Sequence, residues 1–251
     1  FPSMIFHAPS KTLYGLSAPD STVEGDAPGN FFAFNIQSGK TVFTCESKSK
    51  VSRSCFLDRE GRAYWDSEGY ITSYDPRSGI VTNTGAKIPT ATDKPGNLRA
   101  SSRVSTNGIV YCITHDGTIF SFNTANSEIK EITKTFESGA PYTGVCKLDP
   151  TERFLYYAPG SHGSGDKKGM NGAPVIQLDL ATGKKKVIVF LLNAVREQKE
   201  YVVGGSFSTA FDKSGKLFLC VWNGAPIVPV TKSKLFGLCS VTLMEIPASE
   251  R

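Results

Sequence analysis

A β-hairpin that recurs along the chain constrains the fold more than any other feature of this sequence. Five stretches place an apolar run, a polar turn and a second apolar run in the same order, with turns that begin at His7, Asp58, Ser105, Asp149 and Asp212. The spacings between these turns are 51, 47, 44 and 63 residues. A period in this range, with a hairpin as its unit, is typical of the four-stranded blades of a β-propeller.

A second turn follows four of these hairpins and keeps the same register. It opens with Asn or Asp and closes with Gly in three of its four copies, at residues 34–40, 74–80, 122–128 and 178–184. The opening side chain can accept a hydrogen bond from the backbone two residues on, and the glycine supplies a positive φ. In the third copy Ser127 replaces the glycine, which predicts a strained or differently shaped turn. We assign this turn to the hairpin between the third and outermost strands, c and d, of a blade.

The sequence therefore predicts an all-β fold, a single β-propeller domain over residues 1–251, with about five blades visible. Helical periodicity is confined to one candidate helix at residues 192–201. A β-sandwich is the alternative, but it does not require one turn to recur at this spacing. The last repeat has a single strand after its hairpin, and the chain begins with an inner strand. We expect a six- or seven-bladed propeller that lacks one or more N-terminal blades here, the alternative being an open five-bladed ring.

Charge and composition exclude some classes of protein. The net charge of +5 is spread along the chain, and the densest basic run is at residues 183–187, so the sequence argues against a nucleic-acid binder. No apolar run is long enough to span a bilayer. The first residue is Phe1, so the compartment is unknown, and a secreted or periplasmic protein is expected if a leader is missing. The six cysteines form no C-x-x-C pair and are expected to be buried thiols, with a Cys220–Cys239 disulfide as the alternative.

The second repeat, residues 58–79, carries a resemblance to a known group of propellers. Its matching positions are Asp58, Gly61, Trp65, Gly69, Ile71, Asp75, Pro76 and Gly79. This pattern resembles the blade repeat of the virginiamycin B lyase and gluconolactonase-like propellers. The resemblance implies the propeller fold and a site at the mouth of the central channel, where lyases of that group hold a metal with histidine and acidic residues. No catalytic position of that group is carried over to this chain.

Loop lengths predict which face of the propeller binds a ligand. The b–c and d–a connections of a propeller emerge on one face, and the a–b and c–d turns emerge on the other. The a–b and c–d turns are short throughout, whereas the long connections are 17–30, 85–103, 158–174, 191–206 and 222–237. All of this elaboration is on the b–c and d–a face, which we therefore expect to be the binding face. The glycine-rich loop 158–174 lacks the order of a phosphate-binding loop, so it is interpreted as an excursion over this face.

Two of the three histidines are expected on the binding face. His115 lies in the b–c turn of the third repeat and His162 in the b–c loop of the fourth, where a neutral imidazole could act as a base or metal ligand. His7 is interpreted as a residue of an a–b turn. Tyr142 and Tyr201 are candidate proton donors for β-elimination from a uronate. The alternative for the His162 loop is a surface excursion with solvated charges.

Arginines at the starts of the inner strands are the candidate substrate ligands. Arg53, Arg99 and Arg103 suit a carboxylate or sulfate group, with inter-blade salt bridges as the alternative, and Lys167 on the fourth b–c loop joins this set. The sequence leaves the cofactor unknown, with a divalent cation as the candidate. Its candidate ligands are Asp20, Glu24 and Asp26, and solvated charges are the alternative reading of these three.

These features predict a ligand-binding β-propeller. Its partner is expected to be a small-molecule or saccharide ligand, and the enzymatic hypothesis is a lyase or hydrolase that acts on an anionic saccharide or lactone. The alternative is a non-catalytic scaffold whose loop face binds a protein or a glycan. A cluster of titratable side chains that converge at the channel mouth would favour the enzyme.

Overall fold

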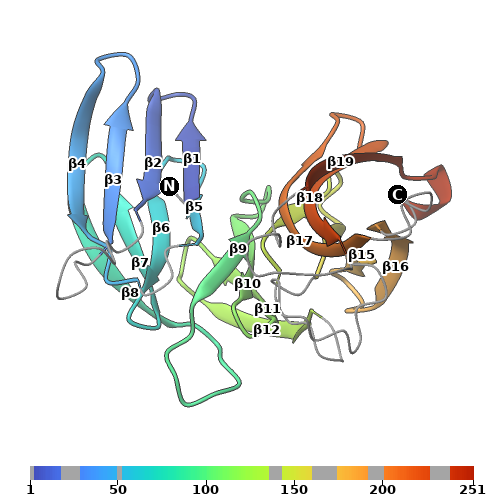
Figure 1. Cartoon of the computed structure of the whole chain (residues 1–251). Coiled ribbons are helices and arrows are strands. Elements are labelled where there is room, and N and C mark those ends of the chain that lie inside the picture. The colour runs from blue at the N-terminus through green and yellow to red at the C-terminus, as the bar shows by residue number, and fades with distance from the viewer. Residues whose placement is uncertain are drawn as a thin grey trace. The chain divides into compact units, whose positions relative to one another are not determined.

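The computed structural model describes residues 3–17, 29–49, 53–135, 143–159, 174–191, 201–226 and 238–251, and for 201–207, 222–226 and 238–240 it describes the backbone alone. These residues form five antiparallel sheets, four of four strands and one of three (Figure 1). The fold class is confirmed: the chain is all-β and built from the successive blades of a β-propeller. Within the described residues the chain divides into two compact units, Phe1–Glu131 and Ile132–Arg251.

The first unit holds three sheets, each with its strands in chain order. The first consists of β1 (Ser3–His7), β2 (Thr12–Leu16), β3 (Asn30–Asn35) and β4 (Lys40–Glu46). The second consists of β5 (Cys55–Leu57), β6 (Ala63–Ser67), β7 (Tyr70–Asp75) and β8 (Ile80–Lys87). The third consists of β9 (Leu98–Ser101), β10 (Ile109–Thr114), β11 (Thr118–Asn123) and β12 (Ile129–Lys134), whose last residues pass into the second unit.

The second unit holds the other two sheets. The fourth sheet consists of β13 (Cys146–Leu148), β14 (Phe154–Tyr157), β15 (Pro174–Asp179) and β16 (Lys185–Phe190). The fifth consists of β17 (Tyr201–Phe211), β18 (Leu217–Pro226) and β19 (Leu238–Glu245), and a short 3-10 turn at Ala248–Glu250 follows it. The candidate helix lies outside the described residues except for Tyr201, which is the first residue of β17. Residues 201–206 and 222–226, expected in loops, pair as strands because Val202 and Val203 extend the hairpin against Ala225 and Gly224.

Apolar side chains pack between neighbouring sheets of each unit, as expected for blades. Phe31 of the first sheet stacks on Trp65 of the second, with ring centroids 4.2 Å apart. Phe56 and Tyr64 of the second sheet pack against Phe122 of the third. In the second unit, Tyr156 packs on Phe211 and Phe218. Among the described side chains, Cys45, Cys55, Cys112, Cys146 and Cys220 form no disulfide, and all but the half-buried Cys45 are buried, as the sequence predicted for them.

The c–d turns confirm the predicted hydrogen bonds and refine the prediction for Ser127. The side chains of Asn35, Asp75, Asn123 and Asp179 each accept a hydrogen bond from the backbone two residues on. Ser127 has φ +61°, close to the +71° of Gly79, and its N–H donates to Asn123 O at 2.8 Å as Gly79 N–H does to Asp75 O. The third turn therefore keeps the common shape, and Ser127 carries the strain of a left-handed backbone.

The a–b turns are closed by the acidic residue at their start. Asp58 Oδ1 accepts hydrogen bonds from the backbone N–H groups of Glu60 and Arg62, both at 2.9 Å. Asp149 and Asp212 close their turns in the same way. His7 occupies this position in the first hairpin, where its Nδ1 lies 2.8 Å from Ser10 Oγ, so its assignment to a turn is confirmed.

Candidate functional site

The antiparallel order of each sheet places its a–b and c–d turns at one end and its b–c turn at the other. In the first unit the b–c end of the second and third sheets carries the turns Glu68–Gly69 and His115–Gly117. The described parts of the d–a connections, residues 47–49, 53–54 and 88–97, lie at the same end. Figure 1 shows the connection from β8 to β9 looping out at this end. Within the first unit, this is the end where the sequence predicts ligand binding.

A buried carboxyl group lies at the b–c end of β6. Asp66 has 1% of its surface exposed, and Ser49 Oγ donates a hydrogen bond to its Oδ2 at 2.7 Å. Its Oδ1 atom has no hydrogen-bond partner in the part of the chain that the structure describes. Burial raises the pKa of Asp66 to about 6, and the hydrogen bond from Ser49 opposes this rise. A carboxyl group that titrates close to neutral pH is typical of functional sites.

The inner strands of the second and third sheets meet beside Asp66. One register step beyond the pair Cys55↔Trp65 brings Ser54 opposite Asp66. Ser54 Oγ and Ser101 Oγ share a hydrogen bond of 2.7 Å, which ties the residue before β5 to the last residue of β9.

Two arginines lie at this junction. Between β9 and β10 the register passes from Ala100↔Ile113 to Leu98↔Thr114, so Arg99 is the extra residue of a β-bulge. Arg99 has 4% of its surface exposed, and its pKa is lowered to about 10, first by burial and then by the positive charge of Arg53. Arg53 is exposed. The exposed Arg53 and the buried Arg99, the Arg53–Arg99 pair, thus lie close enough for their positive charges to repel each other.

His115 lies on the same end of the first unit, in a separate small cleft of about 190 Å³. The cleft is lined by the β8–β9 connection, including Lys94, and by Asp116. The backbone N–H of His115 donates to Asn97 O at 3.0 Å, and the side chain is exposed. Burial would raise the pKa of Asp116, but hydrogen bonds from Thr114, Ala91 and Thr118 outweigh it and lower the pKa. Asp116 therefore stays ionised and fixes the wall of this cleft.

The remaining predicted site residues are placed only in part. Arg103 follows the end of β9 and precedes the a–b turn at Ser105 by two residues, so it lies at the opposite end of this strand from Arg99. The sequence placed it at the strand start because the extra bulge residue and the short length of β9 leave no signal in the residue pattern. His162, Tyr142 and Lys167 lie outside the described residues, as do Asp20, Glu24 and Asp26, and of Tyr201 the backbone alone is described.

The described residues contain no group of three or more His, Cys, Asp or Glu side chains arranged to hold a metal ion. In the same ranges, no helix has the length and apolar character needed to cross a membrane.

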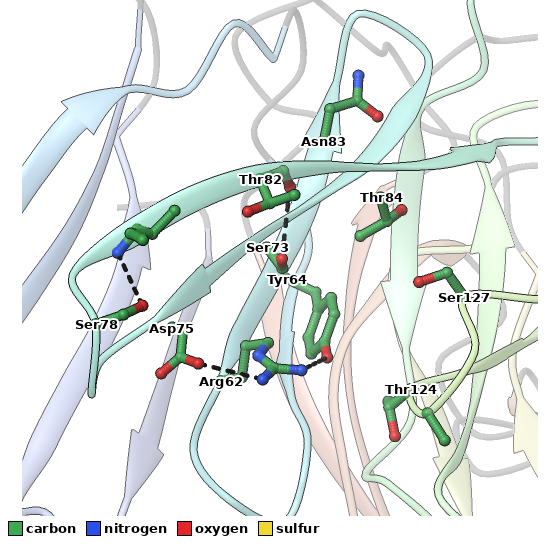
Figure 2. A pocket seen from close by; sticks show the side chains of 12 residues that line it. Arg62, Tyr64, Ser73, Asp75, Ser78, Thr82, Asn83, Thr84, Thr124 and Ser127 are labelled. Atoms are coloured by element: carbon green, nitrogen blue, oxygen red, sulfur yellow. Dashed lines mark hydrogen bonds and ion pairs between the residues drawn. The ribbon is translucent and has the colours of Figure 1, made fainter.

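A second groove lies at the a–b and c–d end of the first unit, between the β7–β8 hairpin and the c–d turn of the third sheet (Figure 2). Its volume is about 440 Å³ and its walls carry mainly hydroxyl groups. Arg62 Nη2 donates to Asp75 Oδ2 at 3.2 Å, and Tyr64 OH donates to Asp58 Oδ2 at 3.2 Å. This network ties the a–b turn of the second sheet to its c–d turn, and the charges of Arg62 and Asp75 cancel.

Comparison with known proteins adds no assignment to a family. No protein-family model matches the chain, and no curated protein is significantly similar to it. The class that the fold defines is therefore the β-propeller, without a narrower group.

Sequence reasoning missed Asp66, although the sequence carries a signal for it. Asp66 lies four residues after Arg62, the residue that closes the a–b hairpin. The corresponding positions of the other four hairpins hold Leu16, Ile113, Ala158 and Val221. A single carboxylate at a strand position that is otherwise apolar marks a residue kept for a reason other than packing.

Proposed function

We propose that the chain is a ligand-binding β-propeller whose b–c end, at the junction of the second and third sheets, binds the carboxylate or sulfate group of an anionic saccharide. The observation that carries this proposal is the Arg53–Arg99 pair. A buried guanidinium group at a β-bulge, beside a second guanidinium group at the surface, attracts an anionic group with both charges. In this proposal, residues 1–251 form a single propeller domain.

The groups around the pair suit a hydroxylated ligand. Ser54, before β5, and Ser101, the last residue of β9, supply hydroxyl groups, and Asp66 supplies a buried carboxylate oxygen without a partner among the described residues. Carboxylates and hydroxyls bind sugar hydroxyl groups through short hydrogen bonds. A saccharide that carries one acidic group per unit would therefore find a cation for the acid and acceptors for its hydroxyls.

The enzymatic form of the proposal is a lyase or a hydrolase. In the lyase, a base removes the proton next to the carboxylate carbon, the glycosidic C–O bond breaks as a C=C bond forms, and the departing oxygen takes a proton from an acid. Arginine charges on the carboxylate stabilise the negative charge that develops in this step. We propose His115 or His162 as the base and Tyr142 or Tyr201 as the acid. Lys167 is proposed to bind the substrate.

Binding of trigalacturonate to the full chain, measured by isothermal titration calorimetry, tests the proposal. The variant Arg53→Gln is expected to weaken binding at least about tenfold, since it removes a charged contact. The matched control is Arg77→Gln, because Arg77 is an exposed arginine of the same unit that lies in the c–d turn at the other end of the second sheet. A neutral methyl-esterified trimer should bind no more tightly to the wild type than to Arg53→Gln.

Equal affinity of Arg53→Gln and wild type for trigalacturonate contradicts the proposed site. Ultraviolet absorbance of an unsaturated product distinguishes a lyase, and new reducing ends without that absorbance distinguish a hydrolase. Binding without either product assigns the chain to the non-catalytic alternative, a scaffold that binds a glycan.

A further inference from the structure

The second unit contains a groove that corresponds to the groove of Figure 2 in the first unit. Arg62 lies four residues after Asp58 and pairs with Asp75, and Arg153 lies four residues after Asp149 and pairs with Asp179. The Nη2–Oδ2 distances are 3.2 Å and 3.1 Å. Each groove is bordered by the c–d hairpin of one sheet and by the segment after strand c of the next sheet along the chain.

Hairpin register aligns the walls of the two grooves residue by residue. Asp75 pairs with Ile80, and Asp179 N–H donates to Lys184 O, so positions 80–82 correspond to 184–186. In the first unit these positions hold Ile80, Val81 and Thr82, of which Ile80 and Thr82 line the groove. In the second unit they hold three consecutive lysines, all of which line the groove.

The presence of lysines at these three positions changes the charge of the groove. In the first unit the lining charges of Arg62 and Asp75 cancel. In the second unit the groove, of about 580 Å³, is lined by five basic and two acidic side chains, a net charge of +3. The groove of the second unit therefore carries a net positive charge that the groove of the first unit lacks.

The basic side chains of this groove differ in how firmly they are held. Arg153 is fixed by Asp179 and lies over the ring of Phe154, with 4.7 Å from its Cζ atom to the ring centroid. Lys186 pairs with Glu250, and Lys185 Nζ donates to Lys134 O at 3.0 Å. Lys184 is exposed and has no acidic partner within the described ranges. A fixed arginine in the same groove as an exposed lysine offers an anion both a directed contact and an additional positive charge.

We propose that this groove, bounded by β15–β16 and residues 249–251, binds sulfate or phosphate groups carried on a saccharide chain. The remaining lining supplies amide and hydroxyl groups from Gln177, Thr182 and Ser249, which suit sugar hydroxyls. Phe154 is the only aromatic residue among the described lining residues, and it has 7% of its surface exposed and is covered by Arg153. The groove thus lacks the aromatic surface on which nucleic-acid bases stack, which disfavours a single-stranded nucleic acid.

An exchange of the corresponding residues between the two grooves tests this proposal. The variant Lys184→Ile/Lys185→Val/Lys186→Thr gives the groove of the second unit the residues of the first. Its binding of a heparin hexasaccharide, measured by calorimetry at low salt, is expected to weaken at least about tenfold. The reverse variant, Ile80→Lys/Val81→Lys/Thr82→Lys, restores binding in the background of the first. Because positions 80–82 and 184–186 are exposed or half-buried, both variants are expected to fold, which circular dichroism checks.

The choice of probes separates the sources of the anion. A phosphorylated mannose oligomer reports phosphate in place of sulfate, and a neutral oligomer of equal length should not bind. Wild-type affinity of the triple lysine variant for every charged probe overturns the proposal. If a DNA oligonucleotide of equal charge binds more tightly than both charged saccharides, the assignment of a saccharide as the ligand is wrong. Heparin also carries the sulfate and carboxylate groups proposed for the Arg53 site, so both lysine variants are compared in the Arg53→Gln background. Heparin binding that remains in this background belongs to the groove, so the two proposals fail separately.

Discussion

Replacement of Asp66 by asparagine is expected to stabilise the folded chain at neutral pH. Burial raises the pKa of Asp66 from 3.8 to about 6. A difference of about two pKa units corresponds to about 3 kcal/mol, which is the cost of keeping this carboxylate ionised in the folded state. The asparagine amide of the variant keeps the acceptor for Ser49 Oγ but places an N–H group where Oδ1 has no partner, at a cost of about 1 kcal/mol. The net gain in unfolding free energy at pH 7 is therefore about 2 kcal/mol.

The sign of the pH dependence follows from the direction of the shift. Because the folded-state pKa of Asp66 lies above the unfolded-state value, the folded state binds the proton more tightly, and stability falls as the pH rises from about 4 to about 6. Urea unfolding of wild type and Asp66→Asn at pH 4, 5, 6 and 7 measures this directly. The advantage of the variant should grow across the window and be absent at pH 4 and below. A difference that is constant with pH would refute the assignment of a buried, ionised carboxylate.

Two further changes test the turn and the core. Ser127→Gly should stabilise the chain by up to about 1 kcal/mol, since φ +61° suits glycine. Gly79→Ala should destabilise it by about 1 kcal/mol, because φ +71° strains an alanine even though no atom lies within 4 Å of the added methyl group. Opposite signs in urea unfolding confirm that backbone strain decides both; equal signs contradict it. Phe31→Ala, which removes the ring stacked on Trp65, should cost about 3–5 kcal/mol and shift the tryptophan fluorescence; a loss below about 1 kcal/mol contradicts the packing.

The blades could be predicted from the sequence because local turn chemistry specifies them. Asp58, Asp75 and their counterparts act through hydrogen bonds to residues two to five positions away, so their spacing alone reveals the hairpins. Alternating apolar residues then assign the faces. The extension of β17 and β18 was missed because Gly224 and Pro226 are typical of loops, and long-range pairing overrides that preference.

The site could be predicted in location and only partly in composition. Arg53 and Arg99 were recognised as candidates from their positions before or within inner strands. The interaction of their charges was not, because it depends on a bulge in β9 and on how close the two residues lie in the folded chain. Asp66 acquires its raised pKa from burial, which depends on packing against residues far along the chain. Ser49, its hydrogen-bond donor, lies 17 residues away with no pattern to mark it.

The guanidinium signals of Arg53 and Arg99 provide the most direct test of the proposed ligand site. Nitrogen-15 spectra of the arginine Nε–Hε groups, assigned by Arg→Lys variants, are recorded while trigalacturonate is added to the full chain. The account predicts that the signals of Arg53 and Arg99 shift together along one saturable curve while those of Arg62 and Arg77 stay in place. Saturable binding that leaves Arg53 and Arg99 unchanged would contradict it.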